Sequence, residues 1–183
     1  MTSVKPISSS YLLFLLSLSF VILSCGKDDD EAINCSARIA LPPFTGITET
    51  DGSGVMNGTV DNTDWGFDTS WNAAEKQLFS GFAAYSLNCS NTDGNEVFPA
   101  FPNGFDQTFS VLVNKGASTI VRMRLVTADG TVISSVDNGT SSSYLFNLED
   151  VFYDSSEPLR LYYVLVQNDG CAFYGHGDVM ENE

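Results

Sequence analysis

The sequence is poor in positive charge. It contains eight Lys and Arg against 23 Asp and Glu, for a formal net charge of −15. Nucleic-acid binding needs clustered Lys and Arg, so this composition argues against a nucleic-acid partner. It equally argues against electrostatic docking on anionic lipid. High negative charge is also the ordinary solubility device of a surface protein.

Catalytic motifs are missing as well. The single histidine, His176, is the one imidazole that a Ser-His-Asp or Cys-His arrangement has to use, and no Gly-x-Ser-x-Gly elbow is present. Its glycine neighbours favour a strand histidine. Acids are plentiful enough for a glycosidase pair, but no pair is distinguished by its setting. We predict a non-enzyme, with a small hydrolase centred on His176 or a carboxylate pair as an alternative.

The sequence has one long apolar run, Tyr11–Leu23, which is short for a membrane-spanning helix. It follows Lys5 with no acid before it, in the order of an export signal. Ser24 and Cys25 come next. This stretch resembles the lipobox of bacterial lipoproteins, which implies signal cleavage after residue 24 and lipidation of Cys25. Two or more acyl chains anchor a protein stably.

An acidic segment, Lys27-Asp28-Asp29-Asp30-Glu31, follows directly. It resembles the surface-export signal of Bacteroidota lipoproteins, and this implies an outer-membrane protein that faces the cell exterior. The alternatives are a plain signal peptide with Cys25 in a disulfide, and an uncleaved anchor. We predict a signal peptide over 1–24, a lipidated tether over 25–36 and one domain over 37–183.

The part of the chain after residue 24 suits a single domain. It has 159 residues and a formal charge of −16, because all 23 acids and seven of the eight bases lie in it. This length is enough for a proper core. Frequent Gly, Ser, Asn, Thr and Asp residues are typical of many short strands and turns.

The clearest strand patterns lie in the second half. Thr108–Val113 alternates, and Asp129-Gly130 predicts a hairpin within Thr119–Val136. A two-residue turn sets Arg122 across from Asp137 and Arg124 across from Ser135. Leu159–Val166 is apolar on both faces apart from Arg160, as in a central strand.

A second hairpin turns at Asn168-Asp169-Gly170 and continues into Cys171–Val179. A two-residue register places His176 opposite Tyr163. We predict a mostly β fold, a single antiparallel β-sandwich whose architecture resembles immunoglobulin-like or fibronectin-like modules. The Cys…Trp…Cys pattern of true immunoglobulin domains is absent.

One short helix is predicted near 73–79. Asn72 with Glu75 three residues later resembles a capping box. Two turns are too few for stability in isolation, so packing must hold this helix. The aromatic residues Phe79, Phe82 and Tyr85 suggest a strand after it.

Three cysteines follow Cys25: Cys35, Cys89 and Cys171. Export implies an oxidising compartment, so one disulfide is expected with one thiol left over. The sequence does not choose the pair, but it favours Cys89–Cys171 because both cysteines flank strand-like runs inside the domain. These separated cysteines lack the paired spacing of a metal site.

Two loops are rich in oxygen ligands. One holds Asp61–Asp64 together with Asp68, and the other is Asn91–Glu96. Either suits calcium, and either suits ordinary solvated turns. Neither matches the EF-hand spacing, so no cofactor is the first expectation and Ca²⁺ the alternative.

An aromatic cluster lies within 65–71. Trp65, Phe67 and Trp71 can form a platform on which sugar rings stack, with Asp64 and Asp68 bonding the hydroxyls. Alternatively, both tryptophans pin the short helix to the sheet.

Three functions remain after these observations. The first is a non-catalytic interaction module, an accessory subunit that binds a protein partner in an outer-membrane assembly. The second is a glycan-binding surface protein that uses Trp65 and Trp71. The third is the small hydrolase. Exposure distinguishes them, since a sugar platform needs exposed tryptophans and a protein partner needs an apolar patch.

Overall fold

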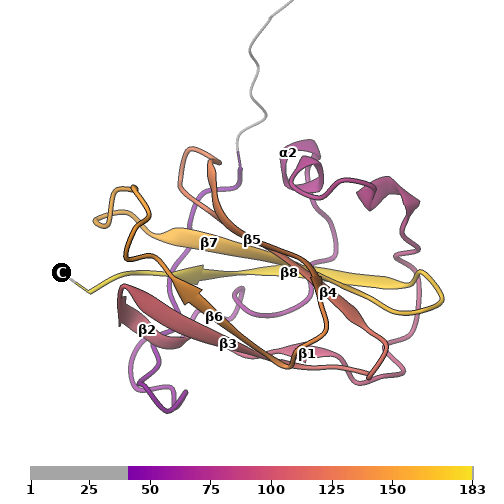
Figure 1. Cartoon of the computed structure of the whole chain (residues 1–183), viewed down its shortest axis with the longest axis horizontal. Coiled ribbons are helices and arrows are strands. Elements are labelled where there is room, and N and C mark those ends of the chain that lie inside the picture. Colours follow the sequence, from indigo (N-terminus) through magenta and orange to yellow (C-terminus); the bar gives the residue numbers. More distant parts are fainter. Residues whose placement is uncertain (1–40, 183) are drawn as a thin grey trace, which may run out of the picture. The chain divides into compact units, whose positions relative to one another are not determined.

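Two antiparallel sheets form most of the fold. A computed structural model describes residues 41–182, and Figure 1 shows its sheets as two layers. Sheet one contains β1 (Glu96–Val97), β2 (Phe101–Asp106), β3 (Thr108–Asn114) and β6 (Ser143–Asn147). Sheet two contains β4 (Ile120–Val126), β5 (Val132–Gly139), β7 (Leu159–Val166) and β8 (Ala172–Val179). The predicted mostly β, antiparallel β-sandwich is confirmed.

The sheets are joined along one edge. In sheet one, β3 pairs with β6 on one side and with β1 and β2 on the other, and the order of sheet two is β5-β4-β7-β8. The residues after β8 cross to β2. The Met180 carbonyl accepts from the Gly104 and Phe105 amides at 3.2 Å, and the Asn182 amide donates to the Phe105 carbonyl at 2.8 Å. The end of the chain therefore closes this side of the sandwich.

The main core lies between the sheets. As predicted, β3 alternates, and its residues Phe109, Val111 and Val113 are buried. They pack in one cluster with the inward residues of sheet two, including Met123 and Leu161. Burial of apolar surface, worth about 25 cal/mol per Å², drives this packing.

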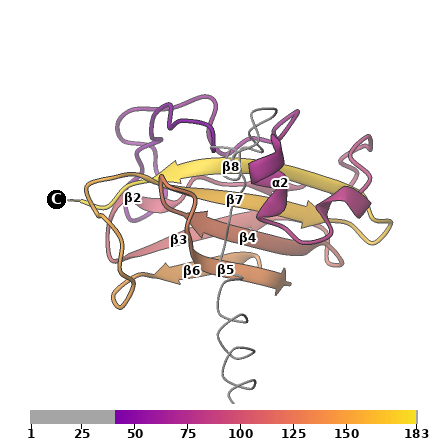
Figure 2. The same cartoon turned by 90° about the horizontal axis from the view of Figure 1, so that it is seen from above.

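A second cluster lies on the outer face of sheet two. The predicted central strand β7 is buried on both faces, so Tyr162 and Val164 point away from the main core. They pack under residues 68–88, which we call the cover. The cover contains α2 (Ala73–Gln77) and the 3₁₀ helix η1 (Phe82–Ala84). Figure 2 shows α2 over this face.

The helix α2 of the cover begins with the predicted capping box. The Asn72 Oδ1 accepts from the amides of Ala74 at 2.8 Å and Glu75 at 3.1 Å, and the Glu75 carboxylate accepts from the Asn72 amide at 2.6 Å. The helix is shorter than predicted and ends at Gln77. Its caps satisfy amides that have no partner within so short a helix.

The strand expected after the helix is wrong. A turn and η1 take its place, with Gly81 at φ +79°, where side chains are strained. Phe79 and Phe82 are three residues apart and both stack on Trp71. An extended chain points such residues to opposite faces, so burying both rings on one side requires helical turns.

The β4–β5 hairpin follows its predicted register only in part. Arg124 pairs with Ser135 as expected, but the register shifts between Val121 and Met123. As a result Asp137 forms its ion pair with Arg124, and Arg122 donates instead to the Ser80 carbonyl in the cover at 3.2 Å. A bulge of this kind re-aims one side chain without breaking the strand.

The β7–β8 register differs by one residue from the prediction. His176 lies opposite Tyr162, and Gly175 lies opposite Tyr163. The reason is the loop, which spans five residues between the Val166–Ala172 pair and has Gly170 at φ +81°. A one-residue slip moves every side chain to the other face, so His176 points outward and both glycines point into the main core.

A buried ion pair ties the start of the described chain to sheet two. Arg160 Nε and Nη2 donate to the two carboxylate oxygens of Asp178 at 2.6 and 2.7 Å. The same guanidinium donates to the Pro42 and Pro43 carbonyls and lies 4.8 Å from the Phe44 ring centre. Its charge is thereby paired and four of its five N–H groups have an acceptor, as favours a buried arginine.

Among residues 41–182, no helix has the length and apolar character needed to cross a membrane.

Candidate functional site

The candidate site forms where the chain leading into the cover runs along the free edge of β8. The Trp65 amide donates to the His176 carbonyl and the Asp68 amide to the Tyr174 carbonyl, both at 2.8 Å. Between them, the Tyr163 hydroxyl donates to the Gly66 carbonyl at 2.6 Å. Residues 65–68 therefore extend sheet two as an irregular edge.

Two glycines in β8 make this close approach feasible. A Cβ on Gly177 would lie 2.3 Å from the Trp65 ring, and a Cβ on Gly175 would lie 2.0 Å from the Gly66 carbonyl oxygen. Neither contact is sterically allowed for any other residue. The absence of side chains at 175 and 177 lets the Trp65 indole enter the main core, where it stacks with Tyr163 at 6.5 Å.

Asp68 and His176 face each other on the outer side of sheet two. His176 Nδ1 lies 2.9 Å from Asp68 Oδ2, and the Trp71 indole N–H donates to the same oxygen at 2.6 Å. Burial lowers the pKa of His176, but the hydrogen bond and charge of Asp68 outweigh burial, and the pKa is raised. Both side chains remain partly exposed, at 17% and 20%.

This pair orients the start of the cover and lacks a nucleophile. In the part of the chain that the structure describes, the hydrogen bond of the His176 ring is to Asp68, and no hydroxyl or thiol bonds the ring. A serine or cysteine mechanism needs a nucleophile within reach of the imidazole. The described residues therefore supply an acid–imidazole pair without the third member of a triad.

Asp64 is buried rather than available for a ligand. It is 8% exposed, and neither carboxylate oxygen makes a hydrogen bond of normal geometry. Burial, followed by the nearby carboxylates of Asp178 and Asp61, raises the pKa of Asp64 to about 7. The predicted role of Asp64 in bonding sugar hydroxyls is thus contradicted by its position.

The predicted tryptophan platform does not form. Trp65 and Trp71 are 7% and 4% exposed, and they belong to different clusters, Trp65 to the main core and Trp71 to the outer one. A sugar ring stacks on an exposed aromatic face, which neither indole offers. The alternative that tryptophans pin the helix to the sheet applies to Trp71, which contacts Phe79, Phe82, Tyr162 and Tyr174.

An aromatic cleft lies beside Asp68. Its volume is about 490 Å³, and Phe67, which is 36% exposed, forms one wall. Phe67 packs against Phe173 at 5.4 Å between ring centres. The remaining lining residues come from the two ends of the cover and from β8: Asp68, Thr69, Leu87, Asn88, Ala172 and Tyr174. Such a mixture of aromatic walls and a few polar groups is typical of small-molecule sites.

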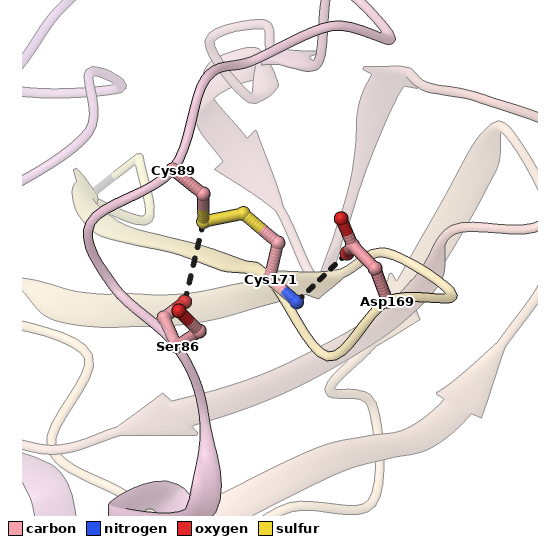
Figure 3. Close-up of a disulfide and its surroundings, with 4 residues drawn as sticks. All are labelled: Ser86, Cys89, Asp169 and Cys171. Atoms are coloured by element: carbon pink, nitrogen blue, oxygen red, sulfur yellow. Dashed lines mark hydrogen bonds between the residues drawn. A yellow bond between two sulfur atoms is a disulfide. The ribbon is translucent and has the colours of Figure 1, made fainter.

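The disulfide fixes the second wall of this cleft. Cys89 and Cys171 are bonded, as Figure 3 shows, and their Cα atoms are 6.1 Å apart. This is the pairing that the sequence favoured. Backbone bonds flank it, because the Ser86 amide donates to the Gly170 carbonyl and the Ala172 amide to the Ser86 carbonyl. Cys25 and Cys35 lie outside the described residues.

The cleft residues Leu87, Asn88, Phe173 and Tyr174 were not predicted as site residues. Each lies within three residues of a bonded cysteine. The favoured pairing therefore contained the information that these two segments meet. The pairing does not predict the path of the chain into the cover, and this path brings Phe67 and Asp68 against the same two segments.

The two oxygen-rich loops use their side chains internally. The Asp61 carboxylate accepts from the Thr63 amide and from the hydroxyls of Thr63 and Thr45. Asn91 bonds the Asn95 amide and carbonyl and so closes the other loop. Within 41–182, no three His, Cys, Asp or Glu side chains are grouped so as to hold a metal ion. Calcium binding stays a prediction.

No protein-family model, no curated protein and no solved structure matches this chain. The function therefore has to be argued from its own residues.

Proposed function

We propose that the chain is a lipid-anchored protein of the bacterial outer membrane that faces the cell exterior and acts as a non-catalytic interaction module. The order of features in the sequence supports this proposal. A basic start, the apolar run Tyr11–Leu23, Cys25 and the acidic tether follow one another as in a surface lipoprotein. The module serves as an accessory subunit that binds a protein partner.

The observation that carries the interaction role is an apolar row on the outer face of sheet one. Phe98, Leu112 and Leu145 are 39%, 41% and 71% exposed. The Phe98 amide donates to the Leu112 carbonyl, and Leu145 pairs with Ser110, two residues from Leu112 on β3. Because residues two apart on a strand share a face, the three side chains form one row across the sheet.

This row is apolar and uncovered, whereas the outer face of sheet two lies beneath the cover. Outward positions of an exposed sheet are normally polar, and contiguous apolar side chains there mark a binding surface. Figure 1 shows α2 on the side of sheet two away from sheet one, so the cover does not shield the row. A protein partner that lays an apolar surface across β3 and β6 would complete the burial.

Capture from native outer membrane in mild detergent tests the partner. The full tagged chain should retain a stoichiometric partner, and Leu112→Ser together with Leu145→Ser should reduce the captured amount at least tenfold. Val132→Ser is the matched control, because Val132 is 43% exposed but lies on β5 of sheet two. A wild-type chain that purifies alone, or equal losses in both variants, would refute the proposed surface.

Anchoring has a separate test. Cys25→Ser removes the sulfur that the lipid would occupy, so labelling of the chain with radioactive palmitate should disappear and the chain should keep its first 24 residues. Ser24→Ala retains a small residue before the cysteine and is the control. Unchanged labelling of Cys25→Ser would exclude lipidation at this position.

Saccharide binding is a second candidate function, now on different residues. Phe67 offers an exposed ring beside Asp68 in the cleft, and Asn88 and Thr69 add polar groups. A polysaccharide screen should find a ligand whose binding is lost in Phe67→Ala. Phe152→Ala serves as the control, since Phe152 is fully exposed elsewhere on the chain. Binding that survives Phe67→Ala would reject this site.

A further inference from the structure

An apolar groove lies along the cover between Lys76 and Leu87. Its volume is about 410 Å³. The side chains that matter for binding are those of Lys76, Phe79, Phe82, Ala83, Tyr85 and Leu87. Leu87 is 39% exposed, so part of the apolar lining faces solvent. The groove therefore falls in the size range of small-molecule sites and offers mainly hydrophobic contact.

Positive charge gathers at this groove in an otherwise acidic protein. Residues 41–182 contain five Lys and Arg, and three of them flank the groove. Lys76 lines it, the Arg122 guanidinium lies 5.8 Å from the Tyr85 ring centre, and Arg124 lies 5.2 Å from that of Phe79. This gathering of cations contrasts with the net charge of −15.

Two of these cations have no acidic partner among the described residues. Arg124 pairs with Asp137, whereas neither Lys76 nor Arg122 forms an ion pair within 41–182. Two buried polar atoms beside the groove are also without hydrogen bonds, the Arg122 Nε and the Tyr85 hydroxyl. Buried polar groups are normally satisfied, and both of these can donate. An acidic oxygen is the group that complements them.

We propose that this groove binds an anionic amphiphile, a molecule with one apolar chain and an acidic head group. The chain lies against Phe79, Phe82 and Leu87, and the head group lies beside Lys76 at the end nearest Arg122. This site is separate from the apolar row on sheet one and does not depend on the partner proposed there. A cationic amphiphile would gain the same apolar contact but would meet Lys76 and Arg122 with like charge.

Calorimetric titration of the purified full chain distinguishes the head groups. Dodecanoate should bind at one site at least tenfold more tightly than dodecyltrimethylammonium, with both below their aggregation concentrations. The affinity for dodecanoate should fall as salt is added, because the charges near the groove are partly exposed to solvent. Equal affinities for the two compounds would overturn the proposal.

Matched variants locate the site. Lys76→Gln should weaken dodecanoate binding about fivefold, and Lys115→Gln, which removes a cation bonded to Thr119 elsewhere, should not. Ala83→Phe should block the groove, whereas Ala84→Phe changes an exposed neighbour that does not line it. The variants have the same sequence except at the substituted position. A difference between the two members of a pair therefore reports on the groove. Equal effects within either pair would refute the assignment.

The acidic head group has two sources, a free fatty acid and an anionic lipid in a membrane. Flotation with phosphatidylglycerol vesicles and with phosphatidylcholine vesicles separates these sources. Binding to the first vesicles by the wild type and not by Ala83→Phe supports a membrane lipid. Dodecanoate binding without vesicle binding supports a free amphiphile. The absence of both overturns the proposal.

Discussion

The two sheets share one core but differ in what covers their outer faces. On sheet one, the outward residues of β3 and β6 alternate with buried ones and remain exposed. On sheet two, β7 is buried on both faces beneath the cover. A sandwich needs only its inner faces buried, so the cover serves something beyond forming the sandwich. It contains the described helices and Asp68, which contacts His176 of β8, and it ends one residue before Cys89 of the disulfide.

The largest expected effect comes from removing the residue that joins the cover to sheet two. Trp71→Ala should lower the unfolding free energy by about 3–5 kcal/mol, since a buried aromatic ring is replaced by a cavity. Urea denaturation followed by far-UV circular dichroism measures the change. Leu145→Ala on the bare face of sheet one is the control and should stay within about 0.5 kcal/mol. Similar effects of both changes would remove the distinction between the faces.

The disulfide should contribute next. Cys89→Ser with Cys171→Ser opens a crosslink between residues 82 apart in sequence, which should lower the unfolding free energy by about 2–4 kcal/mol. The same denaturation experiment detects this loss, and dithiothreitol should reproduce it in the wild type. Added reductant should leave the double variant unchanged. Because the bond fixes one wall of the Phe67 cleft, any saccharide bound there should also be released.

The raised pKa of Asp64 predicts that the stability of the protein depends on pH. Asp64 lies directly before the edge segment that leads into the cover. Its pKa is about 7 in the folded protein against an ordinary value of 3.8, so the folded state binds its proton more tightly than the unfolded state. Stability from this group is therefore present below pH 3.8 and is lost as pH rises from there through 7. After allowance for relaxation around the carboxylate, the loss is on the order of 2 kcal/mol.

Asp64→Asn tests that assignment. The variant should match the wild type near pH 4 and be more stable at pH 8, with unfolding measured by urea titration at each pH. His176 also has a raised pKa, so its contribution is present below 6.5 and declines above that value in both proteins. Parallel stability curves for the variant and the wild type between pH 4 and 8 would contradict the raised pKa of Asp64.

The sequence was sufficient where a local pattern determines the structure. The alternation of β3 reflects one buried face, the apolar pattern of β7 reflects burial on both faces, and the capping box at Asn72 arises from contacts within a few residues. The register of β7–β8 was missed because turn residues do not state how long the loop is, and five residues instead of two reverse the faces.

The site was predictable only in part. Phe67 and Asp68 line a cleft, whereas Trp65 and Trp71 are buried, so the sugar platform that was one of their two possible roles does not form. Aromatic residues next to acids are equally typical of a sugar site and of a covered sheet. The choice depends on whether another segment covers the rings, and that requires long-range packing. Gly175 and Gly177 gave a local indication, because paired glycines in an inner strand face make room for a large ring.

The smallest expected effect comes from a change that tests whether the cover unfolds locally while the sandwich stays folded. Asn72→Ala removes the acceptor of the Ala74 and Glu75 amides and should lower stability by about 1 kcal/mol. Hydrogen exchange measured amide by amide should show faster exchange in α2 and unchanged exchange in β3. Asn168→Ala, in the exposed β7–β8 turn, is the control. If exchange in β3 accelerates as much as in α2, the cover and the sandwich unfold as one cooperative unit. If α2 alone responds, the cover is a separately adjustable layer, and a ligand in its groove can stabilise it without altering the apolar row on sheet one.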